Sequence, residues 1–136
     1  MSGPTNYNQM VITTFRANGG KVPGPNQLLL LTTTGAKTGL PRTTPVAYST
    51  EGGCLVIVAS KGGAPTNPDW YVNLLANPIV TVEFGTESFQ ARASSVADER
   101  ERERLYAHHA ELMPGFAEYP EKTTRKIPVI LLERLG

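Results

Sequence analysis

The sequence predicts a mainly β protein with flanking helices (α+β), in which about six antiparallel strands close into a small barrel. Short apolar runs bounded by turn residues recur along the chain, and 13 glycines and 11 prolines indicate many turns rather than a helix bundle. The strands follow one another through hairpins or single short helices, without a repeated βαβ rhythm. Since 136 residues suffice for one hydrophobic core, we expect a single domain over residues 1–136.

The chain opens with a polar segment, residues 1–8, which we expect to be a flexible tail. A short amphipathic helix is predicted over residues 9–17, because Val11, Ile12 and Phe15 recur at helical spacing. This helix could pack on the domain or rest on a membrane surface. Its few basic residues favour packing.

Three strands are predicted in the first half. Residues 28–34 are apolar, end in β-branched threonines and stop at a glycine, so a strand is favoured over a helix. Residues 42–50 alternate in polarity, and a tight turn over residues 35–41 precedes them. Residues 54–60 begin with a run that is apolar on both faces, which is typical of a central strand.

In the second half we expect a helix over residues 69–77 and a hairpin of two strands over residues 79–84 and 88–96. A second helix over residues 97–113, an irregular aromatic segment over residues 114–124 and a final strand over residues 126–132 should follow. Trp70 and Leu74 share one face of the first helix, and Pro78 ends it. Acidic and basic residues alternate early in the second helix, which indicates a solvated face with ion pairs.

Net charge, cysteine content and hydropathy exclude several classes of protein. Thirteen basic residues against twelve acidic ones leave a net charge of +1, which excludes a whole-surface nucleic-acid binder. The single cysteine, Cys54, can form no internal disulfide, and no apolar run approaches the roughly 18–20 residues that cross a bilayer. We therefore expect a reduced, cytoplasmic protein with no nucleic-acid partner and no transmembrane segment.

Several common site types do not fit the sequence. The two histidines, His108 and His109, are adjacent and would point about 100° apart on a helix, so they cannot share one metal ion. We expect them at the surface or half-buried. The chain contains no G-x-S-x-G motif, and the Lys37-Thr38 pair lacks the glycines of a phosphate-binding P-loop.

Two glycine-rich segments with cations suggest an anion site. Residues 35–41 and 60–66 follow the first and third predicted strands, and the ends of those strands lie on the same side of a meander. Lys37, Arg42 and Lys61 can converge there. In a nearly neutral chain, three cations beside flexible backbone suggest a ligand with more than one anionic group. Solvated loop cations are the alternative.

Aromatic residues near these segments leave two interpretations open. Trp70, the only tryptophan, starts a helix directly after the second glycine-rich segment, and could pack in the core or wall a planar ligand. Asn73 lies one turn on and can both donate and accept a hydrogen bond. The aromatic segment 114–120 could cover a pocket as a lid or simply close the barrel mouth.

Taken together, these residues resemble the deazaflavin (F420)-dependent nitroreductase and quinone reductase family. The ordered motifs that carry the resemblance are FRANGG at 15–20, LLTTTGAKTG at 30–39, Arg42, Pro45, ASKGG at 59–63, NPDWYVNL at 67–74, ANP at 76–78 and KTTRKIP at 122–128. They cover roughly residues 10–134, and the ordered set is highly specific.

The resemblance implies a split β-barrel, similar to FMN-binding barrels, that binds coenzyme F420. Reduced F420 would then deliver a hydride to a quinone, an enone or a nitroaromatic. F420 carries a phosphate and an oligoglutamate tail, which agrees with an anionic ligand. A monomer or homodimer is expected, in the cytoplasm or in peripheral contact with the inner face of the membrane.

By motif, the resemblance assigns these residues to the cofactor: Lys37 and Arg42 to its phosphate and acidic tail; Ser60, Lys61, Gly62 and Gly63 to the phosphate linker and ring edge; Pro45, Ala47 and Val58 to strand positions beside it; and Pro68, Asp69, Trp70 and Asn73 to the helix entry. Phe116 and Tyr119 match an acceptor-side segment. Tyr119 is the first candidate for the catalytic proton donor and Ser60 the second.

Two rival functions remain open. One is an FMN-dependent oxidoreductase on the same split barrel, which would differ in its cofactor spectrum. The other is a non-catalytic F420-binding protein, which would not turn over a quinone with reduced F420.

Overall fold

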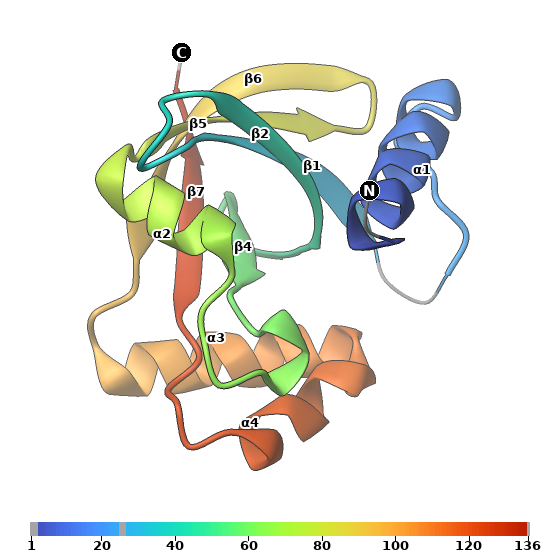
Figure 1. The fold of residues 1–136 in the computed structure, drawn as a ribbon. Coiled ribbons are helices and arrows are strands. Elements are labelled where there is room, and N and C mark those ends of the chain that lie inside the picture. The colour runs from blue at the N-terminus through green and yellow to red at the C-terminus, as the bar shows by residue number, and fades with distance from the viewer. Residues whose placement is uncertain (1–2, 25–26, 136) are drawn as a thin grey trace.

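The computed structural model describes residues 3–24 and 27–135, which form one curled antiparallel sheet flanked by helices (Figure 1). The strand order is β2-β1-β5-β6-β7-β4-β3. The strands are β1 (Leu28–Thr34), β2 (Pro41–Ala47), β3 (Ser49–Glu51), β4 (Cys54–Val58), β5 (Ile79–Phe84), β6 (Glu87–Ser95) and β7 (Val129–Arg134). The prediction of an antiparallel, barrel-like sheet with flanking helices is confirmed.

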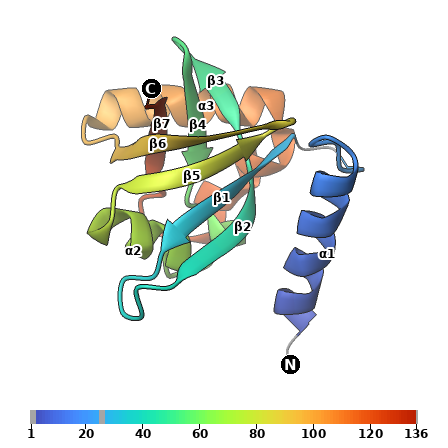
Figure 2. The same cartoon turned by 90° about the horizontal axis from the view of Figure 1, so that it is seen from above.

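The two edge strands, β2 and β3, are consecutive in the chain and are separated only by Tyr48. Ala47 still pairs with Leu28 of β1, whereas Ser49 pairs with Val56 of β4. The chain therefore changes partners at one residue, and the sheet must curl to bring β1 and β4 to either side of it (Figure 2). The predicted single strand over residues 42–50 is wrong in this respect, so the sheet has seven strands instead of six.

Within the described residues, four α-helices and two 3₁₀ turns flank the sheet: α1 (Gly3–Ala17), η1 (Lys61–Gly63), α2 (Asp69–Ala76), α3 (Glu99–Leu112), η2 (Pro114–Glu118) and α4 (Tyr119–Lys122). Helices α3 and α4 lie together below the sheet, α2 lies on another side, and α1 packs at the edge of the domain beside the hairpin of β5 and β6 (Figure 1). In the described range, no helix has the length and apolar character required to span a membrane.

Helix α1 begins earlier than predicted. Residues 1–8 were expected to be a flexible tail, but the helix starts at Gly3, and residues 1–2 lie outside the described range. Pro4 does not prevent this, because a proline in the first turn of a helix has no intrahelical N–H bond to lose. Ile12 and Phe15 are buried against Leu30, so the prediction that this helix packs on the domain is confirmed.

The strands bury apolar residues on both faces. Ile57 of β4 joins the core cluster inside the curled sheet, together with Leu29, Leu31 and Trp70. Its neighbours Val56 and Val58 point the other way, into a second cluster with Leu105, Phe116 and Val129. Because side chains alternate along a strand, the continuous apolar run of β4 serves both clusters at once.

Helix α3 is capped and charged as its sequence suggests. The Asp98 side chain accepts a hydrogen bond from the Glu101 N–H at 2.9 Å, so Asp98 is the N-cap. Arg102 pairs with Glu99 at 2.6 Å and Arg104 with Glu101 at 2.7 Å, which confirms the predicted ion pairs. These contacts lower the pKa of both glutamates.

Candidate functional site

Two predicted site loops leave the same end of the sheet. Strand β1 pairs antiparallel with β5, β5 with β6, β6 with β7, and β7 with β4. Four antiparallel steps return the original direction, so β1 and β4 run the same way. The turn over residues 35–40 and the loop over residues 59–67 therefore start from one end of the sheet. This is the placement that the meander argument predicted.

The three predicted cations are exposed on or beside these loops. Lys37 lies in the turn, Arg42 in the following strand opposite Thr33, and Lys61 in η1. No carboxylate of the described residues lies within 4.0 Å of any of the three, whereas Arg16, Arg102 and Arg104 are all paired. Their positive charge is therefore available to a ligand, although their convergence on one ligand stays a prediction.

Asn73 of α2 ties the first of these loops to the helix. Its side-chain Oδ1 accepts a hydrogen bond from the Ala36 N–H at 2.9 Å, and its Nδ2 donates to Thr33 Oγ1 at 3.2 Å. Gly35 N–H also donates to Leu40 O at 2.8 Å, which closes the turn. Asn73 was expected to contact the cofactor. The structure shows its amide holding the turn that carries Lys37.

Arg125 holds the second loop. This arginine lies between α4 and β7, and its guanidinium donates to the carbonyl oxygens of Ala59, Ser60 and Ala64 and to Asn67 Oδ1, at 2.6–3.1 Å. Sequence reasoning quoted this residue within the 122–128 motif and gave it no role. One sequence signal could have pointed to it: the 122–128 motif carries an arginine at a position that neither strand nor helix periodicity accounts for.

The second loop also packs tightly against α4. Gly63 has a φ of +83°, and a Cβ there would lie 2.8 Å from Lys122 Cβ and 3.2 Å from Tyr119 O. Only glycine fits both the backbone angle and the space. Lys61 likewise has a positive φ, +47°, and its Nζ donates to Thr66 Oγ1 at 3.2 Å. The predicted cofactor loop and the predicted acceptor-side segment are therefore adjacent.

The aromatic side chains of that segment stack on one another. The Phe116 and Tyr119 rings meet edge to face at 5.2 Å between centroids, as their three-residue spacing predicted. Phe116 is only 8% exposed, so most of its ring packs in the core. Tyr119 is half-buried, and Lys122 Nζ lies 5.8 Å from its ring centroid. Of the two predicted acceptor-side residues, Tyr119 has the greater accessible surface.

Comparisons with known proteins identify the family of this chain. The profile of the F420H(2)-dependent quinone reductase family matches residues 7–134. The chain belongs to this family. It is therefore an oxidoreductase, and reduced coenzyme F420 is its cofactor.

Individual proteins and solved structures similar to this chain agree with that assignment. The chain is 42% identical over 118 residues to the F420H(2)-dependent quinone reductase Rv1261c of Mycobacterium tuberculosis, covering 85% of this chain and 79% of that protein. A solved F420-H2 dependent reductase, FDR-A, is 43% identical with a TM-score of 0.70 and covers 78% of this chain and 93% of its own. A structure described as a domain-swapped dimer is 36% identical with a TM-score of 0.73, covering 96% and 100%.

The residues present at this end of the F420H(2)-dependent reductase fit its cofactor. F420 presents a phosphate and several carboxylates, and the site offers unpaired cations on two turns with left-handed backbone at Gly39, Lys61 and Gly63. In the second loop the Ser60 and Lys61 N–H groups donate to no other group of the described residues, and free N–H groups in such turns bind anions. The remaining assigned residues are placed as follows: Val58, Ser60, Pro68 and Trp70 are buried, Pro45 and Ala47 are half-buried, Asp69 is exposed at the start of α2, and Gly62 lies within η1.

Trp70 resolves one of the alternatives left open by the sequence. Its side chain is 9% exposed and belongs to the core cluster with Leu29 and Leu74. The indole therefore packs mainly in the core, and what remains exposed is a small part of its surface. A contact with the cofactor ring stays a prediction for that exposed part.

His109 is a buried residue that the sequence placed at or near the surface, and that expectation is wrong. The side chain is fully buried, its Nδ1 lies 2.9 Å from Ser49 Oγ, and its ring meets Phe116 edge to face at 4.6 Å. Burial lowers its pKa to about 4, so the imidazole is neutral at neutral pH. Within residues 3–24 and 27–135, no cluster of three metal-ligating side chains occurs.

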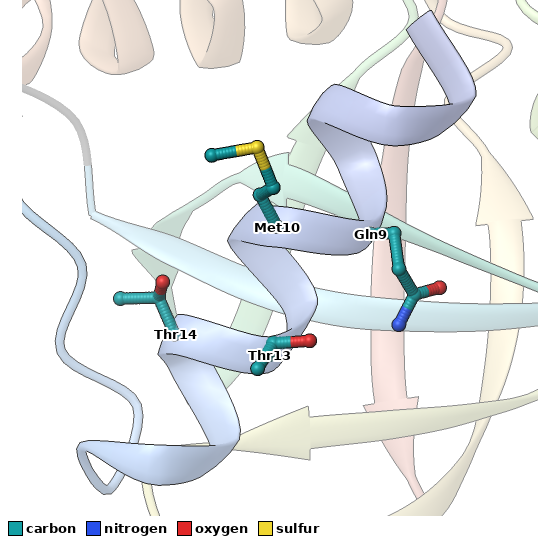
Figure 3. A pocket seen from close by; sticks show the side chains of 4 residues that line it. All are labelled: Gln9, Met10, Thr13 and Thr14. Carbon is teal, nitrogen blue, oxygen red and sulfur yellow. The ribbon is translucent and has the colours of Figure 1, made fainter.

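A shallow hollow runs along α1, away from the two loops. Gln9, Met10, Thr13 and Thr14 line it, with Met10 and Thr14 on one side of the helix and Gln9 and Thr13 on the other (Figure 3). One helix supplies all of these side chains, and none carries a charge. The hollow therefore lacks the convergent polar groups of a small-molecule site.

Proposed function

We propose that this enzyme reduces a quinone where the loop over residues 59–67 packs against the segment over residues 114–122, with Lys37, Arg42 and Lys61 binding the anionic part of F420. One observation carries the proposal: Gly63 packs directly against Tyr119 and Lys122, so a loop with an unpaired cation adjoins an aromatic segment. An anionic cofactor on the first would lie beside an acceptor on the second.

The protein's task is positioning, because bound F420H2 itself supplies the hydride. Lys37 and Arg42 would hold the acidic tail, and Lys61 the phosphate, through charge-assisted hydrogen bonds. The buried face formed by Val58 and Ser60 would exclude water from the reacting carbon. Each of these side chains acts by fixing the donor against the acceptor.

Tyr119 is our candidate for proton delivery to the acceptor oxygen. Its hydroxyl makes no hydrogen bond to another side chain or backbone group in the part of the chain that the structure describes, so it is free to donate. A proton passed from this hydroxyl to a quinone oxygen balances the negative charge that the hydride brings. Ser60 is the second candidate. Phe116 then supports the Tyr119 ring from behind, through the edge-to-face contact.

The acceptor range follows from the same chemistry. An enone or a nitroaromatic also combines an electrophilic atom with an oxygen that becomes negative on reduction, so we include both with quinones. We propose a cytoplasmic monomer or homodimer that can contact the inner face of the membrane peripherally. The similar solved structure described as a domain-swapped dimer supports a test of the dimer by light scattering.

The test is anaerobic turnover. We expect F420H2 to be oxidised in the presence of a soluble quinone and the enzyme, with the oxidised deazaflavin absorbance returning in proportion to quinone consumed. Reduced FMN serves as the control donor and should support much slower turnover. F420 binding without turnover of any quinone, enone or nitroaromatic would favour a non-catalytic F420-binding protein and overturn the proposal.

A further inference from the structure

Resting on the function proposed above, we propose that Arg125 is a positioning residue that shapes the backbone at Ser60 and Lys61 into a preformed phosphate-binding nest for F420. Arg125 does so from behind the loop, without touching the cofactor.

The hydrogen bonds of Arg125 define its role. Nε donates to Ala64 O at 3.1 Å, Nη1 to Ala59 O at 3.0 Å and to Asn67 Oδ1 at 2.6 Å, and Nη2 to Ser60 O and Ala64 O at 2.9 Å each. A guanidinium has five N–H donors, and these five bonds use them all. Arg125 therefore has no donor left for a ligand, and any effect on cofactor binding must act through the loop.

The geometry of the peptide group turns these bonds into a prediction about the loop's opposite side. No peptide bond among the described residues is cis, and in a trans peptide the C=O and N–H groups point in opposite directions. The carbonyls of Ala59 and Ser60 point at Arg125. The N–H groups that share their peptides, those of Ser60 and Lys61, must therefore point away from it.

The backbone angles agree with this. Ser60 lies in the right-handed helical region, with φ −75° and ψ −37°, and Lys61 follows with a φ of +47°. A right-handed residue followed by a left-handed one brings successive N–H groups together in an anion-binding nest. Neither the Ser60 nor the Lys61 N–H donates to another group in the described ranges, so both remain available. The Lys61 side chain adds a charge beside them.

A positive φ at a residue other than glycine is costly and persists only where the surroundings impose it. Here the surroundings are identifiable: Arg125 fixes the carbonyls on both sides of η1, at Ser60 and at Ala64. The backbone N–H of Arg125 in turn donates to Thr123 Oγ1 at 3.1 Å. The neighbouring Lys126 instead lies 3.6 Å from Glu99, away from the loop. Lys126 therefore supplies a matched control of equal charge.

The experiment compares two probes in three proteins. F420 and its deazaflavin fragment, which lacks the phosphate and the glutamate tail, are titrated into the wild type, Arg125→Lys and Lys126→Ala. Lysine keeps the charge and cannot make five bonds, so we expect the Kd for F420 to rise on the order of 10-fold or more in Arg125→Lys, through lost preorganisation. The Kd for the fragment should change little, and Lys126→Ala should match the wild type for both probes.

Turnover separates positioning from general damage. In Arg125→Lys the KM for F420H2 should rise while kcat at saturating F420H2 stays near the wild-type value. Asn67→Ala, which removes one acceptor and leaves the loop backbone in place, should weaken F420 binding in the same direction by a smaller factor. It also serves if Arg125→Lys does not fold.

An equal loss of affinity for F420 and for the fragment, in either variant, would overturn the inference, as would unchanged F420 affinity in both. Absence of F420 binding to the wild type would instead defeat the proposed function itself, so the two failures are distinguishable.

Discussion

Replacing Asn73 with alanine should loosen the turn that carries Lys37. The asparagine is 9% exposed, and its amide joins α2 to the end of β1 through Ala36 and Thr33. Alanine keeps the helix, because its helix propensity exceeds that of asparagine. The substitution therefore removes the tether without disturbing the element that bears it.

The magnitude follows from the two bonds. Each contributes about 0.5–1.5 kcal/mol, and a buried partner left unsatisfied costs about 1–3 kcal/mol. Thr33 is 1% exposed, whereas Ala36 is exposed and water can reach its N–H. We expect the free energy of unfolding to fall by about 2 kcal/mol.

Urea unfolding measures this loss, and Asn77→Ala is the matched control. Asn77 also reaches the end of β1, but its Nδ2 lies 3.5 Å from Thr34 O, at the limit of a hydrogen bond. Its removal should cost well under 1 kcal/mol, less than a typical net bond. The folded Asn73→Ala protein should also bind F420 more weakly than Asn77→Ala. Equal stability and equal F420 affinity in the two variants would refute the claim that the Asn73 amide holds the turn that carries Lys37.

Three further predictions test the site and its support. Lys37→Ala and Arg42→Ala should each weaken F420 binding by roughly 1.5–3 kcal/mol without unfolding the protein, and less for a cofactor shortened of its glutamates; a fall in Tm with unchanged affinity would make these residues structural. Tyr119→Phe should lower quinone turnover on the order of 10- to 100-fold while F420 affinity stays near wild type; an unchanged rate would leave protonation to Ser60 or solvent. His109 takes up a proton near pH 6.5 when unfolded and near pH 4 when folded, so the free energy of unfolding should decrease by about 2–3 kcal/mol as pH falls through that window. His109→Asn should flatten this slope between pH 6.5 and 5, and an unchanged slope would remove His109 as its source.

Local patterns predicted most of the strands and the position of the two loops. The hairpin of β5 and β6 and the run of β4 were readable because turn residues and apolar periodicity are local signals. The shared end of β1 and β4 followed from the alternation of antiparallel strands, which needs no knowledge of packing. The resemblance to the F420-dependent family then supplied the cofactor.

Features that depend on tertiary contacts were not predictable. The change of partner at Tyr48 leaves the alternation of residues 42–50 intact, so a single strand was expected. The five bonds of Arg125 join it to residues 58 to 66 positions away in sequence, and nothing local indicates them. His109 is buried by Ser49 and Phe116, which come from other elements. In each case a distant partner decides the role.

The most direct test of the central claim is a titration of the wild type with F420, FMN and FAD, followed by Trp70 fluorescence. Trp70 lies in the first turn of α2, and Asn73 of the same helix holds the turn that carries Lys37, so its emission should respond to a ligand bound there. We predict saturable binding of F420 and far weaker binding of FMN and FAD, because only F420 carries a tail of carboxylates for Lys37, Arg42 and Lys61. Equal or tighter binding of FMN would contradict the account.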